Sequence, residues 1–134
     1  MRKLRNILVA SVGVAVLIAS VPAAAGLRLT YEVVIDATQR YAAGSMAAAR
    51  NSSDPYQAIG CILNARPGNA SIQCQARDAN DNYATCMIAP PPPEMLAALQ
   101  ALTSEALIYF AWDANGQCSD MFVTLFSYHP PKSP

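Results

Sequence analysis

The three segments YQAIGCIL (56–63), ASIQCQAR (70–77) and YATCMI (83–88) decide the fold of this chain. In the second segment apolar and polar residues alternate strictly, which is typical of a β-strand with one buried face. The other two segments place a cysteine and two apolar residues on one face in the same way. The linkers RPGN (66–69) and DANDN (78–82) are built from residues that favour turns. The sequence therefore predicts an antiparallel β-meander.

Two further strands are predicted near the end of the chain, over residues 107–112 and 118–127. Residues 113–116 between them read Asp-Ala-Asn-Gly, and Asn-Gly is a strong signal for a hairpin. Before the meander, residues 27–35 mix alternation with β-branched residues and predict a first strand. Residues 41–50 (YAAGSMAAAR) suit either a helix or a closely packed strand, and we favour the strand slightly.

Four consecutive prolines at 90–93 end the meander, because proline cannot donate a hydrogen bond to a neighbouring strand. A helix is predicted over residues 93–102, since Pro93 suits the first helical position and Glu94 suits the first turn. The fold class is therefore mainly β: a small antiparallel β-sheet or sandwich domain of about five to seven strands with one short α-helix. The choice between a sandwich and a single sheet stays open. The apolar stripe of the helix consists of Met95, Leu96, Leu99 and Leu102.

Residues 1–25 have the pattern of an N-terminal signal peptide. Three basic residues precede an apolar run over residues 7–21, and three alanines at 23–25 resemble a signal-peptidase site. An uncleaved membrane anchor is the alternative, although Pro22 and the small residues weaken the run as a membrane span. Cleavage leaves residues 26–134 as a single secreted or periplasmic β-rich domain with no stable membrane span.

Removal of the signal peptide also changes the charge. The full chain has 9 basic and 9 acidic residues. Three of the basic residues lie within residues 1–25, so the remaining domain is mildly acidic. An acidic domain with scattered cations has no electrostatic reason to bind nucleic acid or an anionic membrane.

All four cysteines lie in the secreted domain, where an oxidising compartment favours two disulfides. The hairpin turns suggest two competing pairings, Cys61 with Cys74 or Cys74 with Cys86. We favour Cys74–Cys86 together with Cys61–Cys118, because this choice also tethers the last strand. The spacing contains no C-x₂-C pair, which argues against zinc, and no cofactor is expected.

Few residues point to catalysis. His129, the one histidine, sits in a proline-rich tail that is expected to be exposed and unable to orient an imidazole. Residues 78–82 resemble half of a calcium loop, but Tyr83 replaces the required glycine, so a hairpin turn is the better interpretation. A pair of carboxylates could still hydrolyse a glycoside. The candidates for that role are Glu32, Glu105, Asp113 and Asp120.

The aromatic residues of the last hairpin are the feature of the sequence that suggests a binding surface. Core packing is the default interpretation for such residues. We expect Tyr109 and Met121 to share the face opposite Phe110, and this face would bind a partner only if no second layer covers it. The candidate binding surface is Tyr109, Trp112 and Met121.

Residues 41–61 and the WD…G-x-C ending at 112–118 resemble small uncharacterised secreted proteins of Gram-negative bacteria. This resemblance implies no activity. The sequence favours a non-enzymatic secreted or periplasmic interaction module, such as an inhibitor, adhesion or envelope-associated domain with a protein or envelope partner. The alternatives are a small carboxylate-dependent hydrolase and a structural or matrix component.

Overall fold

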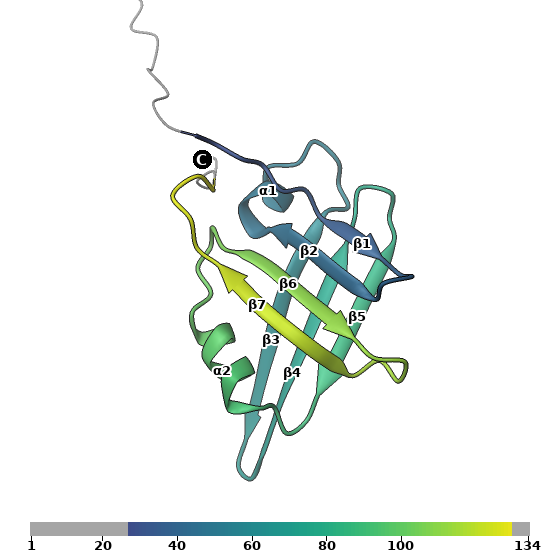
Figure 1. The fold of residues 1–134 in the computed structure, drawn as a ribbon, viewed down its shortest axis with the longest axis vertical. Helices are drawn as coiled ribbons and strands as arrows, with labels where there is room; N and C mark the ends of the chain where they lie inside the picture. The colour runs from purple at the N-terminus through teal and green to yellow at the C-terminus, as the bar shows by residue number, and fades with distance from the viewer. Residues whose placement is uncertain (1–26, 130–134) are drawn as a thin grey trace, which may run out of the picture.

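The computed structural model describes residues 27–129, which form a β-sandwich of two antiparallel sheets with two short helices. The four-stranded sheet has the order β1-β2-β6-β7, and the three-stranded sheet has the order β3-β4-β5 (Figure 1). The predicted signal peptide lies outside the described residues. The elements in chain order are β1 (Val34–Asp36), β2 (Tyr41–Ser45), α1 (Met46–Arg50), β3 (Ala58–Arg66), β4 (Asn69–Arg77), β5 (Tyr83–Ile88), α2 (Pro93–Gln100), β6 (Leu107–Trp112) and β7 (Cys118–Thr124).

The predicted meander is confirmed as the three-stranded sheet. The turn between β3 and β4 is closed by the pair Arg66 and Asn69, and Gly68 inside it has a φ of +75°. The turn between β4 and β5 is organised by Asp78, whose carboxylate accepts hydrogen bonds from Asn80 and Asn82. Residues 78–82 therefore form the hairpin turn that the sequence predicts, with Asp78 as its hydrogen-bond acceptor.

Each helix joins one sheet to the other. The helix α2 begins at Pro93, as predicted, and turns Met95 into the core with Leu96, Leu99 and Leu102 packed against it. The helix α1 was not predicted as a separate element. It begins after the buried Ser45, whose hydroxyl accepts a hydrogen bond from the backbone N–H of Ala48 at 3.3 Å. Residues 41–50 are therefore half strand and half helix.

The predicted first strand is wrong for most of its length, because only Val34–Asp36 pair with β2. Of the preceding residues, Tyr31 still accepts a hydrogen bond from the N–H of Ser45 in β2 at 2.9 Å, but others bond elsewhere. The N–H of Leu29 donates to the carbonyl of Tyr128, and the N–H of Val33 donates to the side chain of Gln57 at 2.8 Å. The start and the end of the described chain therefore lie side by side (Figure 1).

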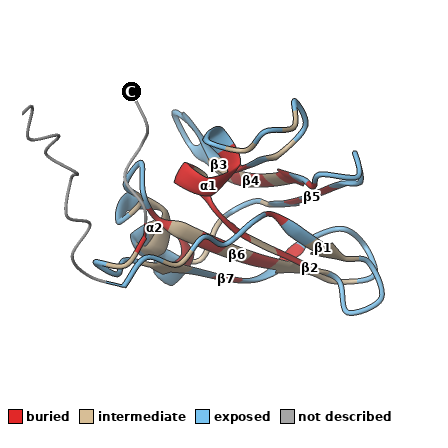
Figure 2. Ribbon diagram, turned by 90° about the horizontal axis from the view of Figure 1, so that it is seen from above, coloured by how far each residue is buried: buried red, intermediate tan, exposed pale blue. Residues whose placement is uncertain are grey.

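The core fills the space between the two sheets. Figure 2 shows the two layers from above, with buried segments in both sheets and in α1. Phe110 and Ile108 of β6 and Ile72 of β4 are the largest fully buried apolar side chains. The second layer decides the question that the sequence left open: the fold is a sandwich.

The favoured disulfide pairing is wrong. The structure joins Cys61 to Cys74, with their Cα atoms 4.0 Å apart, and Cys86 to Cys118, with their Cα atoms 5.0 Å apart. The first bond links β3 to β4 within one sheet. The second bond links β5 to β7 and therefore joins the two sheets. Because β7 begins beside β5 and reaches β3 and β4 only further along, at Met121, Cys118 lies next to Cys86 rather than Cys61.

Candidate functional site

The outer face of the three-stranded sheet is the best candidate for a binding surface. Every second residue of β4, beginning with Ile72, is buried in the core, so the residues between them face outward. On the neighbouring strands, outward-facing Ile62, Tyr83 and Met87 have 49%, 58% and 54% of their surface exposed. These apolar side chains flank the polar outward-facing residues of β4, and exposed apolar surface of this kind is a feature of interaction sites.

This face is hollowed at Gly60, between the edge strand β3 and the end of β4. The hollow has a volume of about 410 Å³, within the range of small-molecule and side-chain pockets. We call it the Gly60 hollow. Its outward-facing lining residues are Ala58, Gly60, Ile62, Gln75, Arg77 and Tyr83.

Of the two glycines that lie in strands within residues 27–129, Gly44 and Gly60, only the buried Gly44 is required by packing. A Cβ atom at position 44 would stand 2.9 Å from the Cα of Val33, so the packing there requires glycine. A Cβ atom at position 60 would meet no atom within 4 Å. Glycine weakens a strand interior, and nothing in the fold around Gly60 requires it. The absence of a side chain at this position creates the hollow.

The rim of the hollow carries one cation that is already paired. The guanidinium of Arg77 donates to the carboxylate of Asp81 and lies 5.4 Å from the ring centre of Tyr56. The hydrogen bond to Asp81 raises the pKa of Arg77 above its ordinary value. Since the charge of Arg77 is balanced locally, the hollow presents apolar surface and the neutral amide of Gln75. This chemistry suits an apolar or uncharged polar group.

The predicted binding residues Tyr109, Trp112 and Met121 do not share one surface. Tyr109 faces outward on the four-stranded sheet and stacks on Phe122 at 4.4 Å and on Tyr41 at 5.5 Å between ring centres. Met121 is buried, and its sulfur lies 3.8 Å from the sulfurs of Cys61 and Cys74. Trp112 is half-buried and packs against the core.

A β-bulge explains this difference. Trp112 pairs with Cys118, and continuing that register would place Tyr109 opposite Met121. The register shifts between Ala111 and Trp112, so Tyr109 lies opposite Phe122 instead. Because facing residues alternate along a strand, this one-residue shift sends Met121 to the core.

The four candidate carboxylates are spread over the molecule. Glu32 and Glu105 line two separate hollows of about 330 and 310 Å³. Asp113 accepts hydrogen bonds from the N–H groups of Asn115 and Gln117, so it serves the β6–β7 turn. Asp120 on β7 lies near Tyr109 and contributes, after burial, to the raised pKa of that phenol. None of the three hollows described here contains two of the four acids.

The expectation that His129 is exposed is wrong. Its side chain is buried, with the rings of Tyr31, Phe126 and Tyr128 arranged edge-to-face around it at 5.9, 6.2 and 5.0 Å. Among the residues that the structure describes, neither ring nitrogen has a hydrogen-bond partner. Sequence reasoning missed this environment because the segment at residues 27–31 that covers the histidine is distant in the chain.

Comparison of the chain with protein-family models, with curated proteins and with solved structures finds no match. Within residues 27–129, none of the helices has the length and apolar character needed to cross a membrane.

Proposed function

We propose that this protein is an exported, non-enzymatic binding module, which holds an apolar group of a protein or envelope partner in the Gly60 hollow. The observation that carries this proposal is Gly60 itself. Position 60 holds glycine, which weakens a strand interior, although the fold has free space there for a side chain. A binding role explains why the space stays empty.

The surroundings of the hollow support this function. Tyr83 and Ile62 line it with exposed apolar surface, and Gln75 offers an amide that can orient a partner. Buried aromatic anchors with polar neighbours are the usual source of affinity in protein interfaces. By contrast, the rings of Tyr41, Tyr109 and Phe122 on the opposite sheet already stack on one another.

Export is part of the proposal. All four cysteines are joined in disulfides, and none is free. Disulfides persist in secreted and periplasmic proteins and are rare in reducing compartments. Together with the signal-peptide pattern of residues 1–25, they support a secreted or periplasmic location.

The carboxylate-dependent hydrolase is the weaker candidate. Glycoside hydrolysis needs two carboxyl groups about 5 to 10 Å apart across one cleft. The acids Glu32 and Glu105 line different hollows, and Asp113 is engaged in a turn.

The experiment compares four forms of the protein in capture of partners from the envelope and medium of the source cells. Gly60→Leu fills the hollow, and Tyr83→Ser removes its aromatic rim. Phe122→Ser is the matched control, since Phe122 is similarly exposed at 46% but lies on the outer face of the other sheet. A captured protein is then purified and titrated against each form by calorimetry.

We expect wild type and Phe122→Ser to bind the purified partner with the same Kd. Gly60→Leu and Tyr83→Ser should bind at least about tenfold more weakly, the effect of losing about 1.4 kcal/mol. Equal binding by all four forms would place the interaction elsewhere and overturn the proposal.

A further inference from the structure

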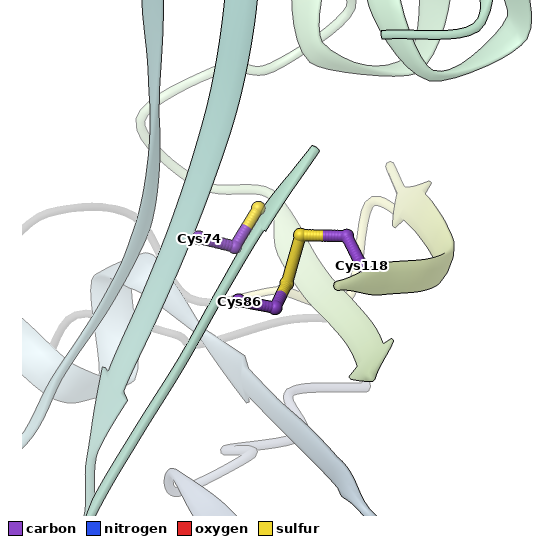
Figure 3. A group of neighbouring side chains, drawn as sticks. All are labelled: Cys74, Cys86 and Cys118. Atoms are coloured by element: carbon purple, nitrogen blue, oxygen red, sulfur yellow. A yellow bond between two sulfur atoms is a disulfide. The ribbon is translucent and has the colours of Figure 1, made fainter. Parts of the chain in front are cut away.

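Three cysteines stand side by side across the three-stranded sheet. Cys74 of β4 lies opposite Cys61 of β3 on one side and opposite Cys86 of β5 on the other. Cys74 is bonded to Cys61, whereas Cys86 is bonded to Cys118 of the other sheet. The sulfurs of Cys74, Cys86 and Cys118 all lie within 4.8 Å of one another (Figure 3). The two disulfides are therefore in contact, and Cys74 has two possible partners.

We propose that this cluster is a thiol–disulfide exchange site. Its substrate is an external thiol that enters at Cys61, and its product is a rearranged protein in which Cys74 is bonded to Cys86. This inference goes beyond partner binding at the Gly60 hollow and does not depend on it.

The exchange takes three balanced steps. A thiolate RS⁻ attacks the sulfur of Cys61, which forms a mixed disulfide at Cys61 and releases Cys74 as a thiolate. The Cys74 thiolate attacks the sulfur of Cys86, which forms the Cys74–Cys86 bond and releases Cys118 as a thiolate. A second thiolate then resolves the mixed disulfide, which releases RSSR and leaves Cys61 reduced. Two RSH molecules are oxidised, one protein disulfide is reduced, and the two released sulfurs each take up a proton.

The entry point follows from burial. Cys74, Cys86 and Cys118 are 0%, 2% and 3% exposed, whereas Cys61 on the edge strand β3 is half-buried. An external thiol can therefore approach Cys61 before any other cysteine. Attack on Cys61 makes Cys74 the leaving group, which places the new thiolate beside the second disulfide.

The choice of Cys86 as the target follows from the strand pairing. Directly opposite residues of antiparallel strands have Cα atoms about 4.5 to 5.5 Å apart, within the range that a disulfide spans. Cys74 and Cys86 are such a pair, so their bond forms without movement of the backbone. The apolar surroundings, which include the sulfur of Met121 at 3.8 Å from Cys74, disfavour a thiolate. Uncatalysed exchange should therefore take minutes to hours.

The exchange has a structural consequence. Of the two disulfides, only Cys86–Cys118 joins the two sheets. Its loss leaves the backbone bridge between Met87 and Gln117 and the apolar core to hold β7 against β5. A thiol would therefore convert a cross-linked sandwich into one whose sheets are held together by this backbone bridge and by apolar packing.

The test is limited reduction of the oxidised wild-type protein with glutathione in the presence of EDTA. Free thiols are blocked with N-ethylmaleimide, and the species with one remaining disulfide is mapped by mass spectrometry of peptic peptides at low pH. We expect the Cys74–Cys86 linkage with Cys61 and Cys118 blocked. A species that keeps Cys86–Cys118 with Cys61 and Cys74 blocked would overturn the proposal.

Two controls separate directed exchange from random rearrangement. The same reduction in denaturing urea gives the distribution expected without native structure, and the Cys74–Cys86 linkage must exceed that fraction severalfold in the native protein. The variant Cys61→Ser leaves Cys74 as a free thiol beside the second disulfide. It should yield Cys74–Cys86 and a free Cys118 without any added thiol. If this variant does not fold, the wild-type experiment still decides.

Discussion

Gly44 of β2 and Val33 lie in direct contact, so that a Cβ atom at position 44 would stand 2.9 Å from the Cα of Val33. The segment leading into β1 therefore packs directly on the backbone of β2. Both residues are buried, and neither can move without opening the core. This contact has no counterpart at Gly60, and the two glycines should respond to substitution in opposite directions.

Gly44→Ala should lower the free energy of unfolding by about 1 to 3 kcal/mol, the range for overpacking a filled core. Gly60→Val should raise it by about 0.5 to 1 kcal/mol, because a β-branched residue replaces glycine in a strand with free space around it. Urea unfolding followed by circular dichroism measures both. Loss of stability in Gly60→Val would show that the position has a structural constraint.

The two disulfides should differ in their contribution to stability. Cys61–Cys74 spans 13 residues of the chain and Cys86–Cys118 spans 32. The loop-closure entropy of the unfolded chain then gives about 3 kcal/mol for the first and about 4 kcal/mol for the second. Urea unfolding compares the two double variants. Cys86→Ala/Cys118→Ala should lose more free energy of unfolding than Cys61→Ala/Cys74→Ala. A larger loss in the first pair would contradict the loop-entropy argument.

Stability should depend on pH through Asp54. The side-chain amide of Gln57 donates to this carboxylate at 2.7 Å and, with the backbone N–H groups of Gln57 and Tyr56, lowers the pKa of Asp54 from 3.8 to about 2. Because the folded-state pKa is the lower one, the stabilising contribution is present above pH 3.8 and is lost as the pH falls toward 2. An NMR titration of the Asp54 carboxyl carbon measures this pKa directly.

Gln57→Ala is the control for that titration, since the amide of Gln57 is the largest cause of the shift. In this variant the pKa of Asp54 should return toward its ordinary value. The variant also removes the acceptor for the N–H of Val33, so its overall stability should fall at every pH. A titration curve unchanged by Gln57→Ala would assign the shift to another group.

His129→Phe should stabilise the protein. The imidazole brings two nitrogens that have no hydrogen-bond partner within residues 27–129 into a cluster of Tyr31, Phe126 and Tyr128. Leaving a buried polar group unsatisfied costs about 1 to 3 kcal/mol, and phenylalanine removes that cost while keeping an aromatic ring. Thermal unfolding at neutral pH measures the gain in Tm. His129→Ala, which loses the packing of the ring, is the control. A lower Tm for His129→Phe than for wild type would show that the imidazole is required.

Much of the secondary structure was determined by local sequence alone. The strands at Tyr83–Ile88 and Leu107–Trp112 and the helix start at Pro93 lie where the sequence predicts them. Alternation and proline act over a few neighbouring residues, so their effects need no tertiary information. The same reasoning failed for most of residues 27–33, because the N–H groups of Leu29 and Val33 bond to Tyr128 and Gln57, which are distant in sequence.

The features that matter for the candidate site were decided by tertiary structure. The bulge at Ala111 and Trp112 turned Met121 into the core. The position of β7 beside β5 brought Cys118 within bonding distance of Cys86. The hollow at Gly60 exists because no other element within residues 27–129 covers that face. The sequence by itself determined that this chain forms β-hairpins with one apolar face. Only the tertiary structure decided which side of β7 was buried, which cysteines were bonded and which surface stayed open, because these outcomes depend on contacts between distant segments.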